Sequence, residues 1–115
     1  MAENSTATWQ DFEKIDMRVG KIVAVTDFPE AKIPAYRLNV DLGPDIGVKK
    51  SSARITELYG RDELVGKKVV CVVNFAPKKV GPFRSEVLVM GAYSQGGVVL
   101  LKPELDRAEP GDKIG

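Results

Sequence analysis

The chain has 115 residues, of which 43% are hydrophobic and 29% are charged, as is usual for a single globular domain with one core. It contains one Cys and no His, which excludes an internal disulfide, a Cys/His zinc site within one chain and histidine-based catalysis. The longest purely apolar run, residues 69–73, is far shorter than a membrane span. The first residues lack the basic start and apolar centre of a signal peptide, so we expect a cytoplasmic protein.

The N-terminal segment is predicted to be a flexible tail over residues 1–7, followed by a single domain over residues 8–115. Thr8 is expected to cap a short helix, with Asp11 completing a capping box. Trp9 and Phe12 then lie on one side of that helix. Because a helix of about two turns is unstable alone, these aromatic side chains must pack on the chain's own core or on a second copy of the chain.

The first half of the chain is predicted to form three strands. Residues 17–29 form the first strand, in which Gly20 marks a bend or bulge. Residues 29–34 form a loop, residues 35–43 a clearly alternating second strand, and residues 46–52 a third. In the first strand, one face is expected to carry Met17, Val19, Lys21, Val23 and Val25.

The second half begins with a short helix expected over residues 52–60, with Ile55 and Leu58 pointing inward and Gly60 ending it. A tight connector over residues 62–66 follows. Residues 67–75 form a fourth strand whose continuous apolar run predicts burial on both faces. A fifth strand covers residues 84–93, and a further strand covers residues 96–103.

This order of three strands, a short helix and two more strands is that of an OB-fold, an all-β, five-stranded Greek-key barrel with its helix between strands three and four. The N-terminal helix and a C-terminal strand are extensions of that barrel. A small β-sandwich is the alternative.

The charge is unevenly distributed although the net charge is only +1. Residues 46–85 contain nine basic and three acidic residues, which is a local charge of +6. Such a basic middle segment indicates an anion-binding face, unless the charges are scattered around the surface. The tip between strands four and five is the densest part, with Lys78, Lys79 and Arg84.

The segment VGKKVVCVVNFAPKKVGPFRSEVLVMGA, residues 65–92, resembles the tRNA-binding domain family. The family includes free-standing tRNA-binding dimers and C-terminal modules of some methionyl- and tyrosyl-tRNA synthetases. Its usual form is a strand ending in Asn, a Pro-containing basic loop, a Gly, and Ser-Gln-Gly-Met. Here Asn74 and Ser85 match, whereas Glu86, Val87 and Leu88 depart from the pattern.

A second departure is Ser51-Ser52-Ala53, where the family has Ser-Gly-Leu. Both departures, together with segments such as FPEAKIPAYRLNVDLG and GGVVLLKP, are similar to a branch of small protein-secretion chaperones within this family. The resemblance covers nearly the whole chain. It implies a homodimer joined through the terminal segments and outer strands, affinity for unfolded or exported polypeptides, and tRNA binding as an ancestral or parallel activity. Trp9 and Phe12 are assigned to the dimer interface on this basis.

For nucleic acid, the candidate residues are cations near the ends of strands three and four and short polar groups beside them. Basic side chains give phosphate contacts with a steep salt dependence, and the polar groups donate to sugar or phosphate or hold the loop. The candidates are Lys49, Lys50, Ser52, Arg54, Asn74, Lys78, Lys79, Arg84 and Ser85. The alternative is that the lysines only keep an exposed hairpin soluble.

For polypeptides, the candidates are apolar and aromatic residues around the same loops, because a chaperone needs open apolar surface of low selectivity. They are Phe28, Ile33, Tyr36, Phe75, Phe83, Met90 and Tyr93. Phe83 stands out because it precedes Arg84, and an aromatic ring next to a cation can cover a base or an apolar side chain. Packing in the core or in the dimer interface is the alternative for each of these residues.

An enzyme is not expected, and neither is a metal or another cofactor. The carboxylates Asp41 and Asp45 have no base, nucleophile or phosphate loop near them in the sequence. Cys71 lies in an apolar strand and is predicted to be a small core side chain. The basic tip is therefore expected to hold acidic partners beside an apolar groove, on a surface that RNA and polypeptide share.

Overall fold

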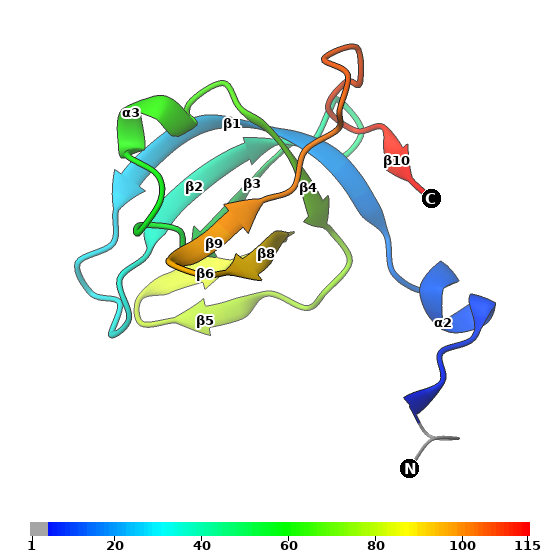
Figure 1. The fold of residues 1–115 in the computed structure, drawn as a ribbon, viewed down its shortest axis with the longest axis horizontal. Helices are drawn as coiled ribbons and strands as arrows, with labels where there is room; N and C mark the ends of the chain where they lie inside the picture. The colour runs from blue at the N-terminus through cyan, green and yellow to red at the C-terminus, as the bar shows by residue number, and fades with distance from the viewer. Residues whose placement is uncertain (1–4) are drawn as a thin grey trace.

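The structure is a computed structural model that describes residues 5–115, so the predicted tail lies partly outside the described residues. Figure 1 shows a curved sheet that wraps into a barrel, with a short helix at each of two opposite ends. The elements are α2 (Trp9–Glu13), β1 (Met17–Asp27), β2 (Tyr36–Asp41), β3 (Val48–Ala53), α3 (Arg61–Leu64), β4 (Lys68–Val72), β5 (Lys78–Val80), β6 (Phe83–Ser85), β7 (Leu88–Val89), β8 (Gly91–Ser94), β9 (Gly97–Leu100) and β10 (Lys113–Ile114).

The barrel is built from antiparallel strands in the order β3-β2-β1-β4-β7, and β10 pairs with the start of β1. The two ends of this sheet approach each other, because the N–H groups of Glu86 and Val87 donate to the carbonyl of Lys50 at 2.7 and 3.3 Å. The result is a nearly closed, five-stranded barrel with α3 between β3 and β4. The predicted OB-fold and its two terminal extensions are confirmed.

The alternation predicted for the first strand is wrong. Gly20 and Ile22 are buried, whereas Lys21 is exposed and Val23 is 42% exposed. The register with β2 shifts between Ile22 and Ala24, so a bulge changes which residues face the core. Gly20 is required by close packing, since a Cβ atom there would lie 2.5 Å from Cγ1 of Val40.

The helix between strands three and four is displaced from its predicted range. Residues 54–60 form a turn, in which Ile55 is buried but Leu58 is 45% exposed. Gly60 does not end a helix but precedes one, and its N–H donates to the Glu63 carboxylate at 2.9 Å. This capping contact favours α3, which buries Leu64 and occupies the segment predicted to be a connector.

The predicted fifth strand is broken into β6, β7 and β8. β5 and β6 form a hairpin with a two-residue turn, and β8 and β9 form another. Only β7 continues the barrel sheet, through its pairing with β4. The two hairpins therefore form separate two-stranded sheets next to the barrel sheet, and Val98 and Leu100 of β9 pack against the core cluster.

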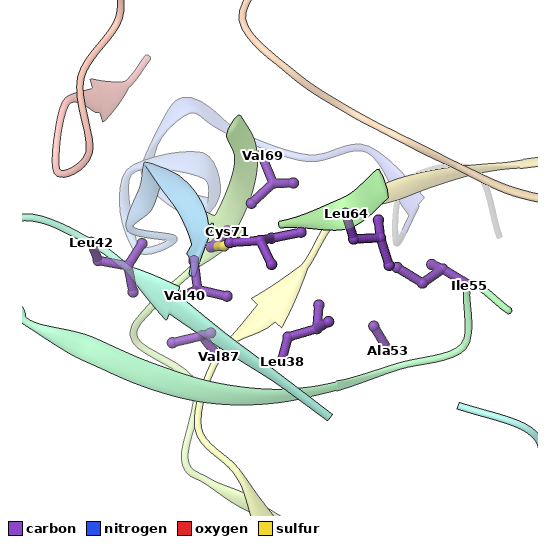
Figure 2. Close-up of a cluster of buried hydrophobic side chains, with 10 residues drawn as sticks. Leu38, Val40, Leu42, Ala53, Ile55, Leu64, Val69, Cys71 and Val87 are labelled. Carbon is purple, nitrogen blue, oxygen red and sulfur yellow. The ribbon is translucent and has the colours of Figure 1, made fainter. Parts of the chain in front are cut away.

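Alternating residues from β2 and β4 fill the interior of the barrel. Figure 2 shows these side chains pointing toward one another, with Leu64 and Ile55 at one end and Leu42 at the other. The buried cluster consists of Ile22, Leu38, Val40, Leu42, Ala53, Ile55, Leu64, Val69, Cys71 and Val87. Cys71 is 0% exposed, which confirms the predicted core position, and burial raises the pKa of its thiol to about 12.

The terminal segments meet at the start of β1. The capping box of α2 forms as predicted, with the Asp11 N–H donating to Oγ1 of Thr8 at 3.1 Å. Asp16 accepts from Nε of Arg18 at 2.7 Å, and this hydrogen bond lowers the pKa of the Asp16 carboxyl. Within residues 5–115, no helix is both long and apolar enough to span a lipid bilayer.

Candidate ligand-binding groove

A groove of about 950 Å³ opens between the two hairpins and the loop before β2. Its floor comes from the ends of β3 and β7 and from the chain that follows them. Most of the side chains facing it are apolar. The residues that line the groove include Glu30, Lys32, Ile33, Ser52, Arg54, Phe75, Lys78, Val80, Ser85, Glu86, Leu88, Met90, Gly91, Tyr93 and Val98.

The β5–β6 hairpin forms one wall. Lys78 pairs with Ser85, and Lys79 pairs with Arg84. Because neighbouring residues of a strand point to opposite faces, Lys79 and Arg84 lie on the face away from Lys78 and Ser85. Lys78 and Ser85 line the groove. The three cations predicted to form one basic tip are thus divided between two faces of the hairpin.

Side-chain hydrogen bonds fix this wall to the barrel. Oγ of Ser85 accepts from the N–H of Ser52 at 3.0 Å, and the Glu86 carboxylate accepts from the N–H of Lys50 at 2.9 Å. These bonds satisfy N–H groups at the outer edge of β3, where regular strand pairing stops. Ser52 and Ser85 therefore position the groove wall as well as lining it.

The charge of the groove is mixed. Lys32, Arg54 and Lys78 line it together with Glu30 and Glu86. All three cations are exposed, and none of them forms an ion pair within the described residues. Three cations against two carboxylates leave a small positive excess at the rim of an apolar groove.

Of the residues predicted for nucleic acid, Ser52, Arg54, Lys78 and Ser85 line the groove. The other five lie elsewhere. Lys49 and Lys50 point to opposite faces of β3, and the Lys50 Nζ lies 5.5 Å from the centre of the Phe83 ring. Asn74 is engaged with the N-terminal segment, since its side chain bonds the backbone of Lys14 and Asp16.

Of the residues predicted for polypeptide, Ile33, Phe75, Met90 and Tyr93 line the groove, and Tyr93 is 95% exposed. The other three have partners within the chain. Phe28 is buried and its ring centre lies 5.3 Å from that of Phe83. The Tyr36 hydroxyl donates to the Tyr59 carbonyl at 2.8 Å.

Residues in the groove and next to it have not all been predicted from the sequence. Lys32 and Leu88 line the groove, whereas Arg37 does not line it and lies over the rings of Phe28 and Phe83, at 5.3 and 5.9 Å. Arg37 occupies an outward position of the alternating second strand, directly opposite Ser52. The alternation of polar and apolar residues in that strand could have indicated that Arg37 faces outward. By contrast, nothing in the sequence near Lys32 or Leu88 indicates that these two residues lie close together.

Metal binding has no support in the described part of the chain. Across residues 5–115, no three side chains of the His, Cys, Asp and Glu types gather closely enough to hold an ion.

Comparison with known proteins places this geometry in a family. The family described as "Putative tRNA binding domain" matches residues 17–113. A methionine–tRNA ligase of Thermococcus onnurineus is 38% identical over 96 residues, and one of Christiangramia forsetii is 33% identical over 113 residues. The matches cover 84% and 97% of this chain but only 13% and 16% of the ligases.

Solved structures of similar length match along nearly the whole chain. The CsaA chaperone protein of Picrophilus torridus is 55% identical with a TM-score of 0.91, and the chaperone CsaA of Bacillus anthracis is 44% identical with a TM-score of 0.88. Each match covers 96% of this chain and 100% of the other. A MetRS-related protein of Pyrococcus horikoshii is 25% identical with a TM-score of 0.84, covering 96% of this chain and 99% of that one. The chain therefore belongs to the tRNA-binding domain family, in the branch that contains the CsaA proteins.

Proposed function

We propose that this chain is an export-related chaperone that binds unfolded or exported polypeptides in the groove and acts as a cytoplasmic homodimer. The observation that carries this proposal is the open apolar surface of the groove. Phe75 is 48% exposed, Leu88 is 47% exposed and Tyr93 is 95% exposed, although all three line the same cavity. Apolar side chains that gather around an open cavity are typical of a binding surface.

The composition of the groove suits a client of variable sequence. Apolar side chains accept many partners through burial alone, and the flexible thioether of Met90 adapts to their shapes. Lys32, Arg54 and Lys78 at the rim add attraction for acidic client residues. The names of the two CsaA structures describe those proteins as chaperones, which supports the same role here.

The test is a binding titration with a fluorescently labelled, chemically unfolded polypeptide. The variant Leu88→Asp places a charge on the groove floor, and we expect at least tenfold weaker binding. Val65→Asp is the matched control, because Val65 is 53% exposed and does not line the groove. Equal affinity of both variants would show that clients bind elsewhere.

A second candidate function is tRNA binding, and the outer face of the β5–β6 hairpin favours it. Lys79 and Arg84 are directly paired across the two strands. Like charges in such a pair destabilise a hairpin, and a bound phosphate would offset that cost. Neither residue has an ion-pair partner among residues 5–115. The family membership points to the same class of ligand.

This second function is tested with mixed tRNA at several salt concentrations. Changing both Lys79 and Arg84 to Ala should weaken binding at least tenfold and reduce the salt slope by about 2. Lys78→Ala is the control, since Lys78 lies on the groove face of the same strand. If an excess of unfolded polypeptide displaces the tRNA, the two ligands share a surface despite this division of the cations.

A further inference from the structure

The outer edge of β8 is unpaired in the β8–β9 hairpin, and two β8 residues, Gly91 and Tyr93, line the groove. In the described part of the chain β8 pairs with β9 alone. We propose that a bound polypeptide adds to β8 as an extra antiparallel or parallel strand, so that its backbone, rather than its side chains, supplies the main contacts. This inference rests on the proposed chaperone function and specifies how the client is held.

The register of the hairpin identifies the backbone groups on this edge. Ser94 pairs with Gly97 across a two-residue turn, and such a closing pair exchanges two hydrogen bonds. Hydrogen-bonded pairs alternate with pairs that are not hydrogen-bonded, so Ala92 and Val99 are bonded, whereas Gly91 and Tyr93 direct their N–H and C=O groups away from β9.

Two observed bonds agree with this alternation. The N–H of Leu100, which pairs with Gly91, points away from β8 and donates to the Tyr59 hydroxyl at 3.0 Å. One step further along the hairpin, the N–H of Leu101 donates back to the Met90 carbonyl at 3.2 Å. The outer edge of β9 is thus occupied at Leu100, while Gly91 and Tyr93 on β8 have no backbone partner outside the hairpin among the described residues.

Both of these residues line the groove. Gly91 has no side chain, so the surface that it contributes to the groove is backbone. A Cβ atom at position 91 would lie 2.5 Å from Cγ1 of Val98, so the packing of the hairpin keeps this position free of a side chain. The free edge of β5 is a weaker candidate for strand addition. Lys79 is the β5 residue whose backbone N–H and C=O point away from β6, and it does not line the groove.

The chemistry of this edge selects an extended polypeptide. Gly91 and Tyr93 offer two N–H donors and two C=O acceptors, repeated at a spacing of two residues, and this pattern is complementary to another strand. Backbone bonds carry no sequence preference, which suits a chaperone. The excess of Lys32, Arg54 and Lys78 over Glu30 and Glu86 favours a segment with acidic residues beside its apolar ones.

The first test is amide hydrogen exchange, measured by NMR on the full chain. The probe is an eight-residue peptide of alternating valine and threonine with a glutamate at each end. In the free protein, the N–H groups of Ala92 and Ser94 should exchange slowly because β9 protects them, whereas those of Gly91 and Tyr93 exchange fast. Bound peptide should slow exchange at Gly91 and Tyr93 at least tenfold.

The second test separates backbone from side chain at one position. Tyr93→Pro removes the outward N–H without touching a hydrogen bond to β9, and edge strands tolerate proline at such positions. Tyr93→Ala removes the ring but keeps the N–H. We expect the proline variant to bind the peptide at least tenfold more weakly than the alanine variant. Retained protection of Ala92 and Ser94 verifies that the hairpin is intact; if it is lost, the exchange test on the unaltered chain decides.

The outcomes distinguish the two levels of the proposal. If the peptide binds, and Leu88→Asp weakens it, but exchange at Gly91 and Tyr93 is unchanged, strand addition is wrong and the groove remains the client site. Strand addition is also wrong if Tyr93→Pro, with its hairpin intact, binds the peptide with the same affinity as Tyr93→Ala. If the unaltered protein binds neither this peptide nor an unfolded polypeptide, the chaperone function itself is refuted, and strand addition with it.

Discussion

Asn74, two residues after the end of β4, is hydrogen-bonded to Asp16, which lies 58 residues earlier in the sequence. Its side-chain oxygen accepts from the Asp16 N–H at 2.9 Å. The amide nitrogen of the same side chain donates to the Lys14 carbonyl at 2.7 Å. In return, the N–H of Val73 donates to the Asp16 carbonyl at 2.9 Å. One carboxamide therefore satisfies both a donor and an acceptor in the segment that connects α2 to the barrel.

Asn74→Ala is expected to lower the free energy of unfolding by about 1–2 kcal/mol, because two hydrogen bonds are lost. Urea denaturation measures this change. Asn39→Ala is the control, since the Asn39 side chain is exposed on β2 and forms no hydrogen bond among the described residues. If Asn74→Ala instead retains full stability and weakens tRNA binding, Asn74 belongs to the ligand site and the tie is incidental.

The helix α2 offers a second prediction. Trp9 is 82% exposed and Phe12 is 43% exposed, and α2 lies apart from the barrel in Figure 1. A five-residue helix does not persist without packing, so a second copy of the chain is the expected cover. Changing both residues to Ala should raise the dimer dissociation constant at least tenfold in analytical ultracentrifugation.

The matched control for the dimer carries Val48→Ala and Val65→Ala, which are 56% and 53% exposed in the single chain. Trp9 is the only tryptophan, so its fluorescence also reports assembly. With Phe12→Ala alone, the emission should stay red-shifted at concentrations where the unaltered protein shifts to the blue. An unaltered protein that sediments as a monomer at all concentrations would contradict the assignment.

The third prediction concerns the rings of Phe28 and Phe83, which are tilted by 60° with centres 5.3 Å apart. Arg37 lies over both rings and Lys50 over one. A double-mutant cycle with alanine at both positions should give a coupling of about 0.5–1.5 kcal/mol. Because neither ring lines the groove, Phe83→Ala should leave polypeptide affinity within about threefold, unless the hairpin itself unfolds. If the coupling energy between Phe28 and Phe83 is zero and Phe83→Ala no longer binds polypeptide, Phe83 contacts the polypeptide and the packing interpretation is wrong.

The order of the first four barrel strands could be predicted from the sequence because each of them has its own apolar pattern. Prediction from the sequence failed where a tertiary contact decides a local conformation. The bulge between Ile22 and Ala24 depends on how β1 packs against β2, with Gly20 directly over Val40. The position of α3 depends on the hydrogen bond between Gly60 and Glu63. The apolar pattern over residues 52–60 predicted a helix before this point, and the sequence alone did not show which of the two segments is helical.

The types of residue in the candidate site could be predicted from the sequence, but the face of the β5–β6 hairpin on which each residue lies could not. The cations and aromatic residues around residues 74–85 were found, and Arg54, Lys78, Phe75 and Tyr93 do line one groove. The sequence could not show that residues 78–80 form a strand, whose alternation separates Lys78 from Lys79. It also could not show that Phe83 is packed against Phe28, because the two are far apart in the chain.

The thiol of Cys71 provides a final prediction. Burial raises its pKa from 9.0 to about 12, so that at pH 8 only about one thiol in ten thousand is ionised in the folded state. A disulfide reagent should therefore react far more slowly with the native protein than with the protein in guanidinium. The shift also has a consequence for stability. It favours folding below about pH 9, and the benefit declines as the pH rises through the folded value of about 12, because only the unfolded thiol ionises freely in that window. Cys71→Ala should thus lose stability less steeply above pH 9 than the unaltered chain, and parallel pH profiles would show that the thiol is not shielded as its burial indicates.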